Sequence, residues 1–307
     1  MPKANLWIVT PCYFDVPSFK KLRSDTLACL SPFSDRYEVK FALIDDTAGL
    51  DSSIKELQAS SDVRVITPDF NLGHQRAIVF GIRLIRSEIQ DQDVVVTMDS
   101  DGEDRPMDLP PMLEAMGKDL THHQIIIARR TKRKTSLKFR LMYSAFVILF
   151  RGLTGKILRS GNFALMPGRT AKKIIFHPFF GLCYSSSLVN INIPVVSVPC
   201  ERGARYFDQS KMGYFNLIMH GFRMLMPYVD RIAMRAIIAS GALVGFTGLT
   251  GLVLLFLKIA GLILISNWYL SVLFIGFVLS CLFLGIFLLL FTVFIQMQSL
   301  VLTKIDQ

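Results

Sequence analysis

The sequence predicts an α/β protein, with a mainly parallel, Rossmann-like sheet between flanking helices and a C-terminal two-helix transmembrane hairpin. Short β-like runs alternate with helical patterns up to Arg130, and the last quarter of the chain is almost free of charge. Alternating strands and helices build doubly wound parallel sheets. Long charge-free stretches are typical of transmembrane helices.

The composition narrows the class of protein further. The 307 residues are 51% hydrophobic and 19% charged, with a formal net charge of +10. Soluble domains carry about 25% charged residues, so this composition argues against a disordered or purely soluble chain. Five widely spaced cysteines without a CxxC pair argue against a disulfide scaffold or a zinc cage.

The predicted strands are short runs rich in β-branched residues, and the predicted helices lie between them. The strands are Leu6–Thr10, Val39–Ile44, Val63–Thr67, Val94–Met98 and Ile125–Ala128. The helices are Ser18–Leu30, Ser52–Ala59, Gly73–Ser87 and Leu109–Lys118. Sheets of this kind bind their ligands at the carboxyl ends of the strands.

The apolar tail predicts two membrane spans, at about 236–257 and 268–295. Each is long enough to cross a bilayer, and the short link between them predicts a hairpin. Arg231, Arg235 and Lys304 flank the hairpin on one side, with Lys258 on the other. Because basic residues concentrate on the cytoplasmic side, we expect an integral protein of the cell inner or plasma membrane, with both termini and the catalytic domain in the cytoplasm.

The middle of the chain is strongly basic, with 13 Lys or Arg and no Asp or Glu between Leu120 and Cys200. Basic segments that lead into apolar helices favour interfacial membrane binding, although core helices remain an alternative. We therefore expect a catalytic domain at 1–211, an interfacial region at 212–235, two spans within 236–303 and a cytoplasmic tail at 304–307. A lipid bilayer is the expected partner of the basic face, rather than nucleic acid. A GxxxG spacing at Gly241 and Gly245 indicates close helix packing and leaves a homo-oligomer open.

Acidic residues follow two of the predicted strands. Asp45 and Asp46 come after the second strand, and Asp99, Asp101 and Glu103 alternate after the fourth. Packing carboxylates together is costly unless a cation neutralises them. Oxygen ligands suit Mg²⁺ or Mn²⁺, which often bridge to substrate phosphates. A metal–diphosphate site is the resulting hypothesis, and a solvated acidic loop is the alternative.

Seven motifs, in this order, resemble those of family 2 glycosyltransferases of GT-A fold, and within that family the polyprenyl-phosphate glycosyltransferases. The motifs are Pro11-Cys12-Tyr13-Phe14-Asp15, Asp45-Asp46, Asn71-Leu72-Gly73-His74-Gln75-Arg76-Ala77, Asp99-Ser100-Asp101-Gly102-Glu103, Arg130-Thr131-Lys132-Arg133, Gly161-Asn162-Phe163 and Arg205 to Lys211. The chain departs from the family pattern at Asp15, Gly102, Glu103, Asn162 and Asp208.

The resemblance implies a site residue by residue. The implied nucleotide-sugar-binding set is Pro11, Tyr13, Asp15, Asp45, Asp46, Asp99, Asp101, Arg205 and Lys211. The implied ligands of a Mg²⁺ or Mn²⁺ ion are Asp99, Asp101 and Glu103. The implied catalytic residues are Asp101 and the acceptor-phosphate arginines Arg130 and Arg133. We expect His74 to act at the start of its helix.

The function that follows from the resemblance is a membrane-bound, inverting hexosyltransferase of the cell envelope. The donor is a nucleotide sugar, with UDP-glucose expected first and GDP-mannose second. The acceptor is undecaprenyl or dolichyl phosphate. Two alternatives stay open: transfer to a membrane lipid hydroxyl, and a catalytically silent membrane-binding module. A processive polysaccharide synthase is excluded, because its Gln-x-x-Arg-Trp motif cannot be formed around Trp7 or Trp268.

Overall fold

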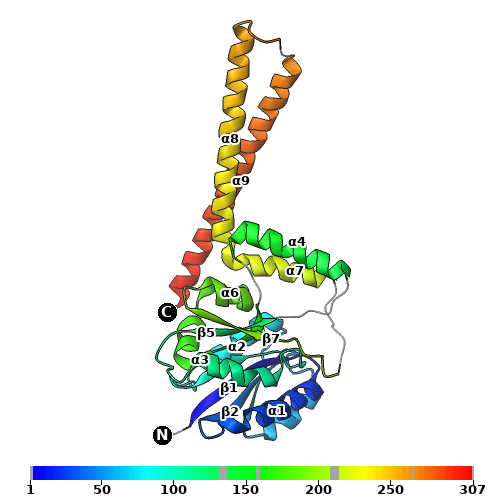
Figure 1. The fold of residues 1–307 in the computed structure, drawn as a ribbon, viewed down its shortest axis with the longest axis vertical. Coiled ribbons are helices and arrows are strands. Elements are labelled where there is room, and N and C mark those ends of the chain that lie inside the picture. Colours follow the sequence, from blue (N-terminus) through cyan, green and yellow to red (C-terminus); the bar gives the residue numbers. More distant parts are fainter. Residues whose placement is uncertain (1–2, 131–136, 157–159, 208–213, 265, 306–307) are drawn as a thin grey trace. The chain divides into compact units, whose positions relative to one another are not determined.

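The computed structural model describes residues 3–130, 137–156, 160–207, 214–264 and 266–305. The chain forms two compact units. The first unit comprises Met1–Ile148 and Lys156–Pro227, and the second comprises Leu149–Gly155 and Tyr228–Gln307. The sheet belongs to the first unit and the long C-terminal helices belong to the second (Figure 1). The predicted domain boundaries at residues 211 and 235 stay predictions.

The first unit is built on a sheet whose strands, within the described residues, follow the order β3-β2-β1-β4-β6-β5-β7. The strands are β1 (Ala4–Cys12), β2 (Tyr37–Asp45), β3 (Val63–Ile66), β4 (Val94–Thr97), β5 (Ile125–Arg130), β6 (Ser160–Pro167) and β7 (Val195–Cys200). Strand β6 is antiparallel to β4 and β5, and the other neighbours are parallel. The predicted α/β class with a mainly parallel sheet is confirmed.

Strands β6 and β7 are the two that the sequence pattern did not predict. Strand β6 has glycine at its second position and proline at its last, and β7 has proline next to its end. Glycine and proline are depleted in strands, so local propensity is weak in both segments. Pairing with strands that are distant in sequence decides their conformation.

Helices flank the sheet, and 3-10 helices lie in several of the connections between elements. The α-helices of the first unit, with the one that crosses into the second, are α1 (Val16–Leu30), α2 (His74–Ile85), α3 (Leu109–Met116), α4 (Leu137–Thr154), α5 (Gly168–Ile174), α6 (Tyr184–Asn190) and α7 (Tyr214–Leu225). The 3-10 helices are η1 (Ser31–Phe33), η2 (Ser52–Ala59), η3 (Pro106–Asp108), η4 (Pro178–Gly181) and η5 (Met226–Tyr228). The predicted helix at Ser52–Ala59 has the expected bounds but is a 3-10 helix.

Two hydrophobic cores lie on the two faces of the sheet. Successive side chains of a strand point to opposite faces, and β1 follows this rule. Leu6 and Ile8 belong to the core that α1 and α3 cover, whereas Trp7 and Val9 belong to the core that α2 and α6 cover. The layers on both faces leave the strand ends and their loops at the surface, where a site can form.

The second unit holds α8 (Val229–Ile259) and α9 (Asn267–Ile305), which pack on each other as a hairpin (Figure 1). By length and composition, the segments Ile218–Ile259 and Asn267–Phe294 are apolar enough to cross a membrane. A Cβ on Gly248 of α8 would lie 3.2 Å from the Phe277 ring, so this glycine permits close packing. A Cβ on Gly241 or Gly245 would meet nothing within 4 Å, so this GxxxG pair does not serve the hairpin contact.

Candidate active site

Three parallel strands bring their carboxyl ends together in the first unit. In the register of the sheet, Cys12 of β1 lies beside Asp45 of β2, and Val9 of β1 lies beside Thr97 of β4. The loops that follow these strands carry the acidic motifs. Ser100 donates a hydrogen bond to the Pro11 carbonyl at 3.0 Å, which ties the first and fourth loops together. The site expected from the sequence therefore has one location.

The two aspartates after β2 hold loop backbone. The buried Asp45 accepts hydrogen bonds from the amides of Thr47 and Gly49, each at 3.1 Å. Asp46 accepts from the amides of Leu72 at 2.8 Å and Gly73 at 3.2 Å. Burial raises the pKa of Asp46. These carboxylates therefore order the loops that line the site.

The loop after β1 supplies two exposed aromatic rings. Tyr13 is 51% exposed and Phe14 is 46% exposed, and their rings meet edge to face with centroids 4.9 Å apart. Phe14 has a φ of 49°, which is unusual for a residue with a Cβ. Asp15 caps α1 by accepting a hydrogen bond from the Ser18 amide at 3.3 Å. Tyr13 is free to contact a flat ligand, whereas Asp15 is engaged at the start of the helix.

Asp99 lies between a histidine and an asparagine. Asp99 Oδ1 is 2.8 Å from His74 Nε2 and 3.2 Å from Asn162 Nδ2. Burial opposes ionisation of Asp99, but the charge and hydrogen bond of His74 outweigh it and hold the pKa of Asp99 below its usual range. Burial by itself lowers the pKa of His74, but the neighbouring Asp99 outweighs burial and raises the pKa of His74 above its usual value. His74, expected only to start its helix, is thus part of the site.

The acidic loop after β4 is tightly wound. Asp101 Oδ1 accepts a hydrogen bond from the Glu103 amide at 3.0 Å, and Gly102 between them has a φ of +89°. Asp104 accepts from the Asp99 amide at 3.0 Å and from Arg130 at 2.9 Å. Burial and then the neighbouring Asp99 raise the pKa of Asp104 to about 7. Burial also raises the pKa of Asp101.

A second segment, residues 201–207 after β7, lies along this loop, and we call it the strap. The amides of Gly203 and Tyr206 donate to the carbonyls of Glu103 and Asp101, each at 2.9 Å. A Cβ on Gly203 would lie 2.2 Å from the Gly102 carbonyl oxygen, so the contact requires glycine. The Tyr206 ring covers Gly102, and its hydroxyl donates to Asp25 at 3.0 Å.

Arginines pair with the carboxylates of the acidic loop. Arg205 contacts Asp101 at 2.9 Å and Glu103 at 3.1 Å, and Arg202 also pairs with Glu103. Arg130, at the end of β5, lies 2.9 Å from Asp104. The sequence predicts site roles for Arg205 and Arg130. It does not single out Arg202, although the adjacent opposite charges of Glu201 and Arg202 after Cys200 could have indicated it.

Among the described residues, no three His, Cys, Asp or Glu side chains form a ready-made metal cluster. The carboxylates of Asp99, Asp101 and Glu103 are instead each paired with a cationic group of the protein. The repulsion among these carboxylates led to the expectation of a bound cation. In this structure, arginine and histidine side chains offset that repulsion. The predicted residues Arg133 and Lys211 lie outside the described residues.

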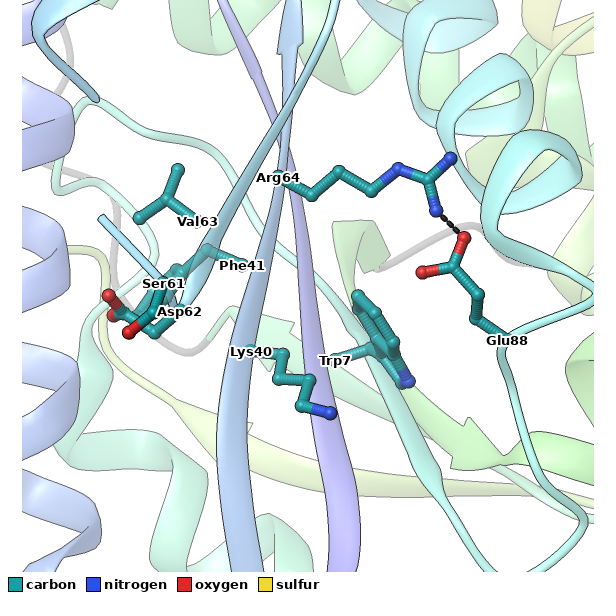
Figure 2. A pocket seen from close by; sticks show the side chains of 8 residues that line it. All are labelled: Trp7, Lys40, Phe41, Ser61, Asp62, Val63, Arg64 and Glu88. Carbon is teal, nitrogen blue, oxygen red and sulfur yellow. Dashed lines mark ion pairs between the residues drawn. The ribbon is translucent and has the colours of Figure 1, made fainter. Parts of the chain in front are cut away.

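One further histidine lies near the site, whereas a hollow in the first unit lies away from it. Helix α7 brings His220 into range of His74 and Asp99, and burial lowers the pKa of His220. At the opposite end of α2, beyond Ile85, a hollow of about 200 Å³ is lined by Trp7, Lys40 and the ion pair of Arg64 with Glu88 (Figure 2). The predicted residues do not line this hollow.

The site combines a mainly parallel α/β sheet with carboxylates and arginines at its strand ends. Residues 7–188, more than half of the chain, match the family model "Glycosyl transferase family 2". The chain belongs to this family.

The chain is also similar to individual curated proteins and to solved structures. The chain is 25% identical over 258 residues to an undecaprenyl-phosphate 4-deoxy-4-formamido-L-arabinose transferase of Edwardsiella ictaluri, covering 81% of this chain and 75% of the relative. It is 24% identical over 288 residues to the enzyme of the same name from Sodalis glossinidius, covering 91% and 83%. Among solved structures, glucosyl-3-phosphoglycerate synthase from Mycobacterium tuberculosis, crystallised with Mn²⁺ and UDP-glucose, has 12% identity and a TM-score of 0.47, covering 75% of this chain and 79% of that one.

Proposed function

We propose that this protein transfers a sugar, with inversion, from a nucleotide sugar to polyprenyl phosphate at a membrane surface, for modification of cell-envelope glycans. The observation that carries the proposal is the contact of Arg205 with Asp101, next to Arg130, because it brings anion-binding groups to the acidic loop. Such a reaction must hold two anions close together. Proximity and fixed charges supply much of the rate in reactions of this type.

The donor side of the proposed site is the acidic loop and the strap. The oxygen atoms of Asp99 and Asp101 are hard ligands that suit Mg²⁺ or Mn²⁺, and the Asp101 side chain keeps 16% exposure. A bound divalent ion would act as a Lewis acid that stabilises charge on the leaving nucleoside diphosphate. Arg205 is in position to exchange its contact with Asp101 for a contact with the diphosphate. Pro11, Tyr13 and the loops ordered by Asp45 would border the nucleoside.

The acceptor side is assigned to Arg130, together with Arg133. Guanidinium groups pair bidentately with phosphate oxygens. The second pKa of a phosphate monoester is about 6, so the acceptor is already an anionic nucleophile at neutral pH. A strong general base is therefore unnecessary, in contrast with transfer to a lipid hydroxyl.

The membrane side rests on the apolar helices. The two long apolar helices of the tail, α8 and α9, serve as spans, with both chain ends in the cytoplasm. Ile218, Phe222 and Met226, at and just after α7, are 50%, 55% and 45% exposed in the first unit. Amphipathic helices with such faces bind at membrane interfaces. We propose that α7 lies at the bilayer surface, where the lipid phosphate is found.

The sugar is the least constrained part of the proposal. UDP-glucose is the first candidate and GDP-mannose the second. The names of the curated relatives add 4-deoxy-4-formamido-L-arabinose as a third candidate sugar. The departures from the family motifs, Glu103 and Asn162 among them, leave the identity of the donor sugar open.

The test is transfer by the purified full-length protein with Mn²⁺ or Mg²⁺, undecaprenyl phosphate and a panel of labelled nucleotide sugars. We expect an acid-labile, lipid-extractable product, and at least a hundredfold loss of rate in Asp101→Ala. Asp91→Ala is the matched control, because Asp91 forms an exposed ion pair with Lys172 away from the acidic loop. Unchanged transfer in Asp101→Ala would refute the metal assignment, and acceptance of sugar by hydroxyl lipids alone would refute the phosphate acceptor.

A further inference from the structure

The Glu103 carboxylate bridges guanidinium groups at the acidic loop. Its Oε1 accepts a hydrogen bond from Arg205 Nε at 3.1 Å, its Oε2 accepts one from Arg202, and Oε2 lies 3.9 Å from Arg130 NH1. The Glu103 side chain is 11% exposed, whereas Arg202 and Arg205 keep 28% and 30% exposure. A guanidinium has five N–H donors, so both arginines can still bind a ligand.

We propose that Glu103 is a positioning residue and not a metal ligand: it holds Arg202 and Arg205 side by side as a preformed clamp for the diphosphate of a nucleotide. This inference rests on the proposed function, and it assigns Arg202 to the donor site. Because one carboxylate engages both arginines through separate oxygens, their spacing is set before a ligand arrives. Ordering two flexible side chains in advance lowers the cost of binding.

The surroundings of Glu103 argue against metal ligation. A ligand oxygen must direct a lone pair at an ion about 2.0–2.6 Å away, yet both oxygens of Glu103 already accept charge-assisted hydrogen bonds. If Glu103 turned toward an ion, Arg202 would lose the Glu103 carboxylate as its partner. The positive charges of Arg202 and Arg205 would then no longer be separated by that carboxylate. Asp101, in contrast, gives one oxygen to a backbone amide and the other to a single arginine. A divalent ion therefore competes for Asp101 at lower cost.

The backbone of the strap does not depend on the Glu103 side chain. The amides of Gly203 and Tyr206 bind the carbonyls of the acidic loop, and the Tyr206 hydroxyl binds Asp25. Shortening the Glu103 side chain therefore leaves the path of the strap in place and changes only the groups that hold the arginine side chains. A substitution of Glu103 can therefore test the positions of the two arginine side chains without moving the backbone of the strap.

The deciding variant is Glu103→Asp, which keeps the charge and withdraws the carboxylate by one methylene group. Full-length protein in detergent is titrated with UDP and with GDP, and the nucleotide that the wild type binds more tightly is used. We expect about tenfold weaker binding, the effect of losing about one charge-assisted contact. Manganese alone, followed by electron paramagnetic resonance, should bind within twofold of the wild type. Glu201→Asp is the control, because Glu201 is next to Arg202 in sequence but contacts Arg105.

A double-mutant cycle tests whether Glu103 acts through Arg202. Arg202→Ala should weaken nucleotide binding about tenfold, and Glu103→Asp should add less than threefold in that background, because coupled residues are not additive. Independent, fully additive effects would overturn the proposal, as would a tenfold loss of Mn²⁺ affinity in Glu103→Asp, which would make Glu103 a ligand.

Two measurements keep a failure of the clamp distinct from a failure of the proposed function. If the wild type binds neither nucleotide, the donor class is wrong, and inorganic pyrophosphate becomes the probe of the clamp. If Glu103→Asp lowers the melting temperature strongly, Glu103→Gln replaces it, since the isosteric amide preserves shape while removing charge. Unchanged pyrophosphate or nucleotide affinity in the folded variant contradicts the clamp.

Discussion

The amide nitrogen of Asn162 lies 3.2 Å from Asp99 Oδ1, and its direction is set from the far side of the site. The backbone amide of Ser185 in α6 can only donate, and it donates to Gln75 Oε1 at 3.0 Å. Gln75 Nε2 must then be the group that donates to Asn162 Oδ1. These assignments point Asn162 Nδ2 toward Asp99. The backbone amide of Ser185 therefore determines that the Asp99 carboxylate faces a hydrogen-bond donor.

Gln75→Glu should therefore impair transfer more than Gln75→Ala. A carboxylate at position 75 can still accept from Ser185, but it cannot donate to Asn162, so the Asn162 amide turns its oxygen toward Asp99. Asp99 then loses the Asn162 donor and faces an acceptor instead, at a position that also lies 2.6 Å from His74 Nε2. Removing one partner of a buried hydrogen bond costs about 1–3 kcal/mol, and we expect about a tenfold lower kcat/KM. Steady-state kinetics on the two variants test this. Equal rates for both variants would show that the amide orientation has no effect.

Gly203→Ala should detach the strap from the acidic loop. The new Cβ would lie 2.2 Å from the Gly102 carbonyl oxygen, so the backbone must move. We expect at least a tenfold weaker nucleotide affinity, because Arg202 and Arg205 move with the strap. Gly181→Ala is the control, since a Cβ there meets nothing within 4 Å. Calorimetric titration and melting temperature separate loss of the site from loss of the fold, and parallel behaviour of the two variants would contradict the prediction.

Stability should depend on pH through Asp62. Two hydrogen bonds from Arg23, each 2.7 Å, lower the pKa of Asp62 below its usual value. A carboxylate with a lowered pKa stabilises the folded state above its unfolded pKa of about 3.9, and this contribution disappears as the pH falls through the folded pKa.

Asp62→Asn should therefore lower the free energy of unfolding by up to about 1 kcal/mol at neutral pH, since the pair is partly exposed. The difference from the wild type should shrink as the pH falls below about 4. Thermal melting of the full-length wild type and variant, at neutral pH and below about pH 4, measures this difference in stability. Asp35→Asn, at an exposed carboxylate with no ion pair among the described residues, should show neither effect. A constant difference at both pH values would count against the Arg23 pair.

The proposed topology places the link between α8 and α9 outside the cytoplasm. A membrane-impermeant maleimide should label Ser266→Cys in intact cells. The native Cys29, partly exposed on α1 of the first unit, should react only after lysis. The opposite labelling pattern would invert the orientation while leaving the hairpin itself intact.

The strands that the sequence predicted are those in which local propensity and burial agree. Strand β4 is buried throughout, strands β1 and β2 are apolar and buried over their carboxyl-terminal parts, and the ends of these strands could be placed within a few residues. Strands β6 and β7 could not, because glycine and proline weaken their local signal and only long-range pairing selects the extended form. The apolar helices α8 and α9 were predictable because their length and lack of charge suffice.

The candidate site likewise has features that the sequence predicts and contacts that only the structure shows. The order of the acidic motifs placed Asp45, Asp99 and Asp101 at the carboxyl ends of two strands that flank β1, since parallel strands must end at one edge of the sheet. Which cation faces each carboxylate depends on segments far apart in the chain: His74 precedes Asp99 by 25 positions, and Arg202 follows Glu103 by 99. Sequence spacing carries no information about such contacts. The sequence by itself determined the α/β class, the family and the two long apolar C-terminal helices, whereas only tertiary packing decided that arginines and a histidine neutralise the acidic loop.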